Sequence, residues 1–230
     1  MIFRQLYDHE SSTYSYLLAE RTGGEALLID PVKANVAQYI QLVDELNLQL
    51  VMAVDTHIHA DHLTALGALQ QLTGCTSAMG DMTKADCVSL HFKEGERLSV
   101  DNLHLEVLYT PGHTDDSYSF VLPDRVFTGD TLLIRGTGRT DFQNGDPAAQ
   151  YDSLFNKLLK LPEETLVYPA HDYHGMTVST IREEKQYNPR LQIPDKQAYV
   201  DLMNSLKLDN PRMMDIAVPA NRNCGLKTAA

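Results

Sequence analysis

The chain has few of the features that mark secreted or membrane proteins. Its 230 residues include only three cysteines, Cys75, Cys87 and Cys224, and no Cys-x-x-Cys motif. Three cysteines cannot all pair within one chain, which favours a reducing compartment, and a core of this size needs no disulfide. The N-terminus lacks the basic and apolar regions of a signal peptide, and no run approaches the roughly 18 apolar residues of a membrane span. We therefore expect a cytoplasmic protein that does not contact a membrane, unless a leader peptide has been removed from the sequence.

Basic residues are also scarce. The chain has 19 Lys and Arg against 31 Asp and Glu, a formal net charge of −12. Proteins that bind the phosphate backbone present a basic surface, so the balance argues against a nucleic-acid partner. It still allows a small anionic substrate held by a few local arginines. The length and the 43% hydrophobic content are those of a globular protein with a sizeable core, by default one domain, although two small domains are possible.

Short apolar runs alternate with segments of helical spacing. The pattern predicts strands over 26–30, 48–55, 103–107, 117–122, 125–130 and 165–170, with a hairpin joining the fourth and fifth. It predicts helices over 32–47 and 63–73 and after Pro147, and a mostly helical tail from about 175, interrupted at Pro189, Pro194, Pro211 and Pro219. The chemical motifs fall where strands end, which is where sheets present catalytic side chains.

Histidine is the residue type that stands out. Six of the nine histidines lie in three short segments, 56–62, 110–115 and 169–175, and a fourth segment, 127–132, supplies Asp130. Neutral imidazoles and carboxylates are the usual ligands of divalent iron or zinc. Such residues at the ends of four separate strands predict a metal site.

The order of these motifs is that of a known superfamily. His-x-His-x-Asp-His at 57–62, then TPGHT at 110–114, TGDTL at 128–132 and a histidine after a late strand resemble the metallo-β-lactamases over nearly the whole chain. The resemblance implies an α/β protein with an αββα sandwich, in which two mixed sheets carry helices on their outer faces. It further implies a single domain spanning 1–230, with a helical C-terminal extension from about 175.

Finer motifs narrow the resemblance. The segments 134–142, 169–180, 188–190 and 217–225 are similar to those of the ETHE1-like persulfide dioxygenases. That family implies one Fe(II) per chain and the oxidation of glutathione persulfide by O₂ and water to sulfite and glutathione, as part of sulfide detoxification. It also implies a homodimer.

The same resemblance assigns roles to individual residues. It implies that His57, His113 and Asp130 bind the iron, a set of two imidazoles and one carboxylate that is typical of non-haem Fe(II) oxygenases. His59, Asp61, His62 and His171 are then expected to hold the ligands and bound waters by hydrogen bonds. In dinuclear relatives these four residues complete a two-metal site, so ligand identity alone leaves that alternative open.

A dinuclear thioester hydrolase of the glyoxalase II type is the competing interpretation. It would use a metal-bound hydroxide and no O₂. The residues after His113 read Thr-Asp-Asp-Ser rather than the Thr-x-Gly-His that resembles the hydrolases, and the Lys-rich C-terminal region of that family is absent. We therefore favour the dioxygenase.

The substrate residues are candidates of a different kind. Glutathione carries two carboxylates, and a guanidinium suits a carboxylate because it binds both oxygens. Candidates for the substrate pocket are Arg139, Tyr173, Arg190, Asn221 and Arg222, and the Tyr173 hydroxyl is also a catalytic candidate. Cys75 and Cys87 are expected to be small buried residues, and Cys224 to be either buried or redox-active. Related enzymes can carry a cysteine where this chain has Thr137, so a mechanism that needs a thiol there does not fit.

Overall fold

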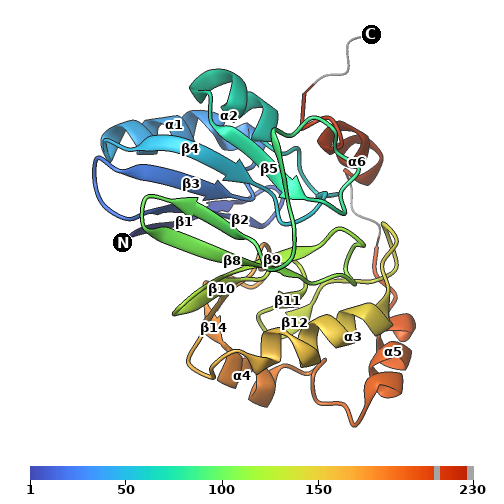
Figure 1. Ribbon diagram of the computed structural model, residues 1–230. Helices are drawn as coiled ribbons and strands as arrows, with labels where there is room; N and C mark the ends of the chain where they lie inside the picture. Colours follow the sequence, from blue (N-terminus) through green and yellow to red (C-terminus); the bar gives the residue numbers. More distant parts are fainter. Residues whose placement is uncertain (210–212, 227–230) are drawn as a thin grey trace. The chain divides into compact units, whose positions relative to one another are not determined.

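The computed structural model describes residues 1–209 and 213–226 (Figure 1). It forms two compact units. Unit 1 comprises Met1–Phe92, Arg97–Leu105 and the C-terminal segment, and unit 2 comprises Lys93–Glu96 and Glu106–Asp209. Among the described residues no helix has the length and apolar character needed to cross a membrane.

Unit 1 is built on a mixed sheet of six strands that follow one another in chain order. These are β1 (Ile2–Asp8), β2 (Thr13–Ala19), β3 (Glu25–Ile29), β4 (Gln49–Val54), β5 (Thr76–Gly80) and β6 (Leu90–Phe92). The first three strands pair antiparallel, and β3 to β6 pair parallel. Parallel neighbours need a crossover, and two of the crossovers carry the short helix η1 (Lys33–Asn35) with α1 (Val36–Glu45), and α2 (Leu66–Thr73). The predicted strands and helices of this region are thus confirmed.

The core of unit 1 lies between the sheet and its helices. Leu28 and Ala53 from the sheet are fully buried with Leu66 and Leu69 of α2, in one apolar cluster that also includes Cys224. Figure 1 shows α1 and α2 on the same side of strands β3 to β5. The helices cover a face of this sheet and not the ends of its strands, and the polar side chains described below follow those strand ends.

Unit 2 holds most of the second mixed sheet. Its strand order is β14-β13-β10-β9-β8-β7. The strands are β7 (Arg97–Val100), β8 (Leu103–Tyr109), β9 (Tyr118–Leu122), β10 (Arg125–Phe127), β13 (Leu166–Tyr168) and β14 (Ser179–Thr180), and a separate two-stranded ribbon joins β11 (Leu132–Leu133) to β12 (Gly136–Thr137). The predicted hairpin is confirmed, since β9 and β10 pair antiparallel, whereas β10 and β13 are parallel.

Helices α3 (Pro147–Asn156), η2 (Leu158–Lys160), α4 (Ile181–Tyr187) and α5 (Lys196–Ser205) complete unit 2. Helix α3 begins where the sequence predicts, because the Asp146 carboxylate accepts from the backbone N–H groups of Ala148 and Ala149 and Pro147 occupies the first turn. Leu154, Ile181 and Tyr199 from three of these helices belong to one buried apolar cluster with Val167 of β13. Helices α4 and α5 are therefore part of the core of unit 2.

The C-terminal region from residue 175 is mostly helical, as predicted, and ends with α6 (Met214–Asn221), which belongs to unit 1. Pro189 and Pro194 separate α4 from α5 as expected, and Pro211 lies outside the described residues. The predicted break at Pro219 is wrong, because Pro219 lies inside α6. Proline there removes the hydrogen bond to the carbonyl of Asp215 and crowds that carbonyl, but Asp215 is exposed, so the carbonyl can tilt outward and water can replace the lost donor.

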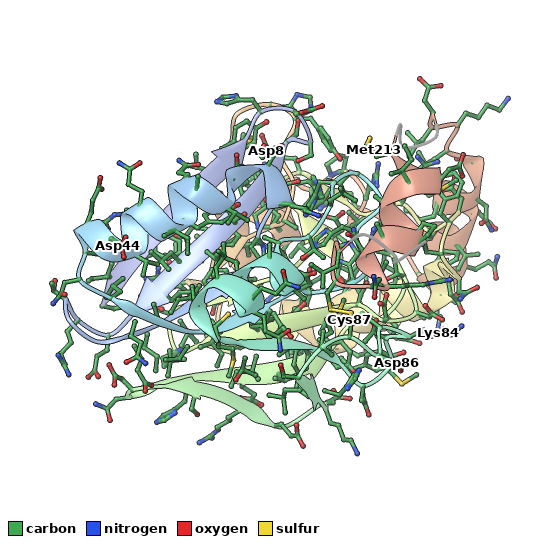
Figure 2. All side chains as sticks on the ribbon, turned by 90° about the horizontal axis from the view of Figure 1, so that it is seen from above. Asp8, Asp44, Lys84, Asp86, Cys87 and Met213 are labelled. Atoms are coloured by element: carbon green, nitrogen blue, oxygen red, sulfur yellow. A yellow bond between two sulfur atoms is a disulfide. The ribbon has the colours of Figure 1, made fainter. Side chains whose placement is uncertain are left out.

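The expectation that Cys87 is a small buried residue is also wrong, since Cys87 is half-buried and paired. Cys87 and Cys224 form a disulfide, with sulfur atoms 2.09 Å apart and Cα atoms 5.9 Å apart. Figure 2 shows Cys87 on the loop that carries Lys84 and Asp86. The two cysteines are 137 positions apart, so only the packing of the C-terminal segment within unit 1 reveals the pair. Cys75 is buried and unpaired, as expected.

Candidate metal centre

The histidine loop of unit 1, residues 55–62, begins directly after β4. Strands β3 and β4 are parallel and Ile29 pairs with Val54, so Asp30 and the start of the loop leave the sheet at the same edge. The Thr56 backbone N–H donates to Asp30 Oδ1 at 2.7 Å, and the Thr56 hydroxyl donates to Oδ2 at 3.0 Å. Asp30 is 1% exposed. A buried carboxylate therefore ties the first turn of the loop to the neighbouring strand.

This anchor determines which nitrogen of His57 can bind a metal. His57 Nδ1 lies 2.9 Å from the Thr56 hydroxyl oxygen. Because that hydroxyl gives its hydrogen to Asp30, it can only accept from His57, so Nδ1 carries the proton. Nε2 then has the lone pair that a metal ligand needs.

His59 and His62 are buried and surrounded by carboxylates. His59 Nε2 lies 3.2 Å from Asp30 Oδ1, and His62 Nδ1 lies 2.8 Å from Asp61 Oδ2. Burial by itself would lower the pKa of His59, but the charges of Asp30, Asp55 and Asp61 and the hydrogen bond to Asp30 outweigh it and raise the pKa to about 9. One ligand atom from each of His59, Asp61 and His62 lies within 4.8 Å of the other two. With a pKa of about 9, His59 would have to lose a proton before this cluster could bind a divalent cation.

The C-terminal segment also holds the histidine loop, through hydrogen bonds to the backbone of the loop. Asn221, at the end of α6, is 1% exposed. Its amide nitrogen donates to the carbonyl oxygens of His59 at 2.9 Å and His62 at 2.8 Å, and its amide oxygen accepts from the Thr64 N–H at 2.9 Å. The amide is thus engaged with the loop backbone, which differs from the expected contact with substrate.

In unit 2, strand register brings Asp130 and His171 together. Strands β10 and β13 are parallel and Phe127 pairs with Tyr168. Asp130 and His171 each follow three positions later, so they meet at the same edge of the sheet. The Ala170 N–H donates to the Gly129 carbonyl at 2.9 Å, and His171 Nδ1 lies 2.7 Å from Asp130 Oδ1. His171 therefore orients the Asp130 carboxylate.

His113 completes this cluster. Its Nδ1 lies 2.7 Å from the carbonyl oxygen of Arg139, and a carbonyl only accepts, so Nδ1 is protonated and Nε2 has the lone pair. Nε2 lies 3.5 Å from Asp130 Oδ2. Gly138 packs flat beside both residues, since a Cβ there would lie 2.1 Å from the Asp130 carbonyl oxygen and 2.8 Å from His113 Nδ1. Within unit 2 an imidazole and a carboxylate thus present facing lone pairs, as two ligands of one ion would.

The arginines differ in what they contact. The guanidinium of Arg139 donates to both Asp141 carboxylate oxygens at 2.7 Å, and its hydrogen bond to Asp141 lowers the pKa of that carboxyl. It also donates to the Asp209 carbonyl at 2.6 Å and lies over the Phe142 ring. These contacts already occupy the guanidinium that was expected to bind substrate.

Arg190 is held by neutral groups only. It donates to the carbonyl and the hydroxyl oxygen of Thr137, and no carboxylate pairs with it among residues 1–209 and 213–226. Burial lowers the pKa of Arg190, the effect expected for a half-buried cation without a counter-charge. An anion beside this guanidinium would be stabilised.

The other two substrate candidates are exposed. Tyr173 is 66% exposed, and its ring is parallel to that of His171 within 9°, with the centroids 6.0 Å apart. Arg222 is exposed at the end of α6. Asp30, Thr56 and Gly138 are positioning residues that sequence reasoning missed. For Asp30 a signal existed, because it is a carboxylate at the end of a buried strand.

Comparison with known proteins identifies the class. The sequence-family model of the metallo-β-lactamase superfamily matches residues 10–171. A metallo-β-lactamase from Staphylococcus aureus has a TM-score of 0.90 at 26% identity, with 97% of this chain and 73% of that chain covered. The predicted metallo-β-lactamase fold is therefore confirmed.

Relatives within the superfamily narrow the family. The mouse protein called persulfide dioxygenase ETHE1, mitochondrial, is 46% identical, and its human counterpart 45%, each over 99% of this chain and 90% of the relative. A crystal structure of ETHE1 from Myxococcus xanthus is 52% identical, with a TM-score of 0.95 over 98% of this chain and 100% of that one. The chain belongs to the ETHE1 family of the metallo-β-lactamase superfamily.

Proposed function

We propose that this protein is an Fe(II)-dependent persulfide dioxygenase that converts glutathione persulfide, O₂ and water to sulfite and glutathione in sulfide detoxification. The observation that carries the proposal is the pair of His113 and Asp130, whose lone pairs face each other at 3.5 Å with the His113 tautomer determined by Arg139. The named activity of the ETHE1 relatives supports it.

The residues present fit one ferrous ion. We assign His57, His113 and Asp130 as its ligands, which is the two-histidine, one-carboxylate set of non-haem iron oxygenases. When bound, the iron would supply the electron that O₂ needs to react, which redox-inert zinc cannot do. The chain contributes orientation: Thr56 and Asp30 fix the tautomer of His57, and the Arg139 carbonyl fixes that of His113.

The remaining polar residues support the ligands. We assign His171 to orient Asp130, and Asp61 to orient His62 in the histidine loop. His59 contacts Asp30, the carboxylate that also anchors Thr56. Such partners maintain ligand geometry and tune ligand basicity. One iron per chain is therefore the occupancy we propose.

For the substrate we assign Arg190 first. Its guanidinium lacks a carboxylate partner among the described residues, so a carboxylate of the glutathione part would supply the missing counter-charge. To bind the substrate, the Arg139 guanidinium would first have to break its two hydrogen bonds to the Asp141 carboxylate. Tyr173 is exposed beside His171 and remains the proposed hydroxyl donor. Arg222, which is exposed, remains a candidate for substrate binding, and we assign Asn221 to the support of the histidine loop.

Two further assignments accompany the function. We propose a homodimer, to be measured by sedimentation, and a cytoplasmic location, to be measured by cell fractionation. The named mammalian relatives are called mitochondrial, so fractionation decides between the two compartments for this chain.

The deciding experiment separates oxygenation from hydrolysis. The iron-loaded protein is incubated with glutathione persulfide under ¹⁸O₂, and separately with S-lactoylglutathione without oxygen. Dioxygenation predicts O₂ consumption matched to sulfite formation, with ¹⁸O in freshly formed sulfite, corrected for exchange with water. Anaerobic thioester cleavage without persulfide-dependent O₂ uptake would instead identify a hydrolase.

A further inference from the structure

We propose that the Cys87–Cys224 disulfide is a thiol-exchange site that couples the thiol redox state of the surroundings to the order of the histidine loop. Its reagents are low-molecular-weight thiols. The inference rests on the proposed function only in that the reaction proposed above releases such a thiol, glutathione.

The two sulfur atoms differ in accessibility. Cys87 is half-buried and directly follows Asp86, on a loop whose residues Lys84 and Asp86 are exposed (Figure 2), whereas Cys224 is 1% exposed. Thiol exchange requires a thiolate to approach one sulfur in line with the disulfide bond. The Cys87 sulfur is therefore the one attacked, and the Cys224 sulfur is the leaving group.

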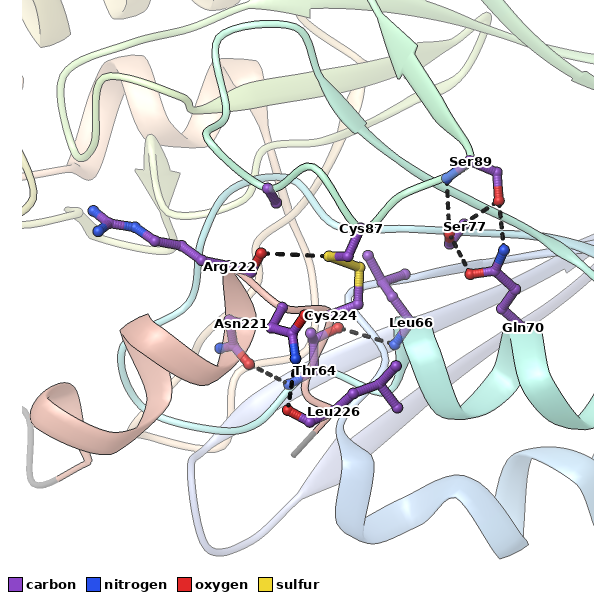
Figure 3. Close-up of a disulfide and its surroundings, with 12 residues drawn as sticks. Thr64, Leu66, Gln70, Ser77, Cys87, Ser89, Asn221, Arg222, Cys224 and Leu226 are labelled. Carbon is purple, nitrogen blue, oxygen red and sulfur yellow. Dashed lines mark hydrogen bonds between the residues drawn. A yellow bond between two sulfur atoms is a disulfide. The ribbon is translucent and has the colours of Figure 1, made fainter. Parts of the chain in front are cut away.

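The Cys224 end is continuous with the support of the histidine loop (Figure 3). The Cys224 carbonyl accepts from the Gly67 N–H at 3.0 Å, at the start of α2. Gly225 has φ +69° and packs so closely on the loop exit that a Cβ would lie 2.0 Å from the Thr64 carbonyl oxygen. Asn221, three positions before Cys224, makes the three hydrogen bonds to His59, His62 and Thr64.

The disulfide is the covalent bond that holds this segment in place. Without it, residues 221–226 are held by hydrogen bonds such as those of Asn221 and of Lys33 to the Gly225 carbonyl, and by the apolar packing of Cys224 in the core of unit 1. Local groups of hydrogen bonds open with free energies well below that of global unfolding. Reduction therefore increases the fraction of molecules in which Asn221 has left the loop, and the histidines lose a positioning contact.

The chemical step balances with two thiols. One thiolate attacks the Cys87 sulfur, the Cys87–Cys224 bond breaks, and Cys224 leaves with the electron pair and takes up a proton. A second thiolate attacks the sulfur of the first thiol in the mixed disulfide and releases Cys87 as a thiolate. Two thiols are oxidised to one small disulfide, and the protein disulfide is reduced to two thiols.

The experiment compares oxidised and reduced wild-type protein by hydrogen exchange and mass spectrometry. Millimolar glutathione at neutral pH is expected to reduce the disulfide without denaturant, on a time scale of minutes to hours. Exchange in peptides covering 57–64 and 213–226 should then rise about tenfold, while peptides from α3 stay unchanged. Iron affinity should fall by about tenfold, the lower end for a lost outer-shell contact.

Two variants serve as matched controls. Cys87→Ser should show the reduced pattern in either buffer, and Cys75→Ser should respond as wild type. Each of three results would overturn the proposal. The first is three alkylatable cysteines in the air-oxidised protein, and the second is a disulfide that is reduced only in denaturant. The third is unchanged hydrogen exchange at 57–64 after reduction. Hydrogen exchange does not depend on catalytic turnover. A negative dioxygenase assay would therefore not affect the disulfide proposal, and unchanged hydrogen exchange would not affect the proposed dioxygenase activity.

Discussion

Units 1 and 2 position their histidines by different means. In unit 1 the histidines lie within six residues and are held mainly by side chains, namely Asp30, Thr56 and Asn221. In unit 2, His113, Asp130 and His171 come from three separate strand ends, and His113 is fixed by a backbone carbonyl and by a glycine packed against it.

This difference predicts different sensitivity to mutation. A side-chain anchor can be removed by substituting one residue and leaves the backbone in place. A backbone anchor can be disturbed only by moving the chain, so the vulnerable position is the one where no Cβ fits. The variants below test this contrast, from the largest expected effect to the smallest.

Asp130→Ala should abolish the proposed function. It removes the only carboxylate assigned to the iron and leaves His113 and His171 without their shared partner. Iron content by elemental analysis and persulfide-dependent O₂ uptake should fall together, each by more than about 100-fold. A variant that retains a full complement of iron would show that the ligand assignment is wrong.

Gly138→Ala tests the backbone anchor of unit 2. The added Cβ would meet the Asp130 carbonyl oxygen at 2.1 Å, so the 138–139 backbone and with it the Arg139 carbonyl must shift. We expect iron affinity to fall by about 10- to 100-fold. Gly136→Ala is the matched control, since its nearest neighbour would be the Leu133 Cβ at 3.8 Å. Equal iron binding by both variants would contradict the proposed role of the backbone.

Asn221→Asp tests the side-chain anchor of unit 1. A carboxylate keeps the shape of the amide but cannot donate to the carbonyl oxygens of His59 and His62. Iron affinity should fall by about tenfold, measured by competition with a chelator. Asn223→Asp is the control, because the Asn223 amide donates only to the Leu226 carbonyl at 3.3 Å among the described contacts. If Asn221→Asp affected KM alone, the originally expected substrate contact would be the better assignment.

The two arginines provide a test of substrate binding. Arg190→Ala should lower kcat/KM by roughly 10- to 150-fold, the equivalent of about 1.5–3 kcal/mol for a charge-assisted contact, with iron retained. Arg139→Ala should have a smaller effect, since the Arg139 guanidinium is already paired with Asp141. Steady-state kinetics on both variants measures the contrast, and the reverse order of effects would make Arg139 the carboxylate-binding residue.

Tyr199→Phe should have the smallest effect, on stability. The buried hydroxyl donates to Gln150 Oε1 at 2.8 Å and contacts Thr137, and its loss should cost about 1 kcal/mol in urea unfolding. Burial raises the pKa of Tyr199 to about 12, above the ordinary value near 10. The stabilisation is therefore complete below about pH 10 and is lost as pH rises through about 12. A wild-type advantage that does not shrink over that interval would contradict the burial of the hydroxyl.

Much of the fold followed from local pattern. Alternation and helical spacing located β3, β4, α1, α2 and the β9–β10 hairpin, because each depends on residues close in sequence. The break predicted at Pro219 failed because the effect of a proline depends on whether its lost hydrogen bond faces water. No strand was predicted for β5 to β7. β6 and β7 are short and partly exposed, and β5 is buried but has only five residues, so none of the three shows a long apolar or alternating run.

The sequence by itself determined the family and the candidate ligands, because the histidine and aspartate motifs are local and their spacing reflects the strand ends that carry them. Only the tertiary structure decided how those residues are held. The Cys87–Cys224 pair, the contact of Asn221 with the histidine loop and the pairing of Arg190 with Thr137 join positions 137, 159 and 53 residues apart. Such contacts leave no local signature, since they depend on the packing of whole elements rather than on neighbouring residues.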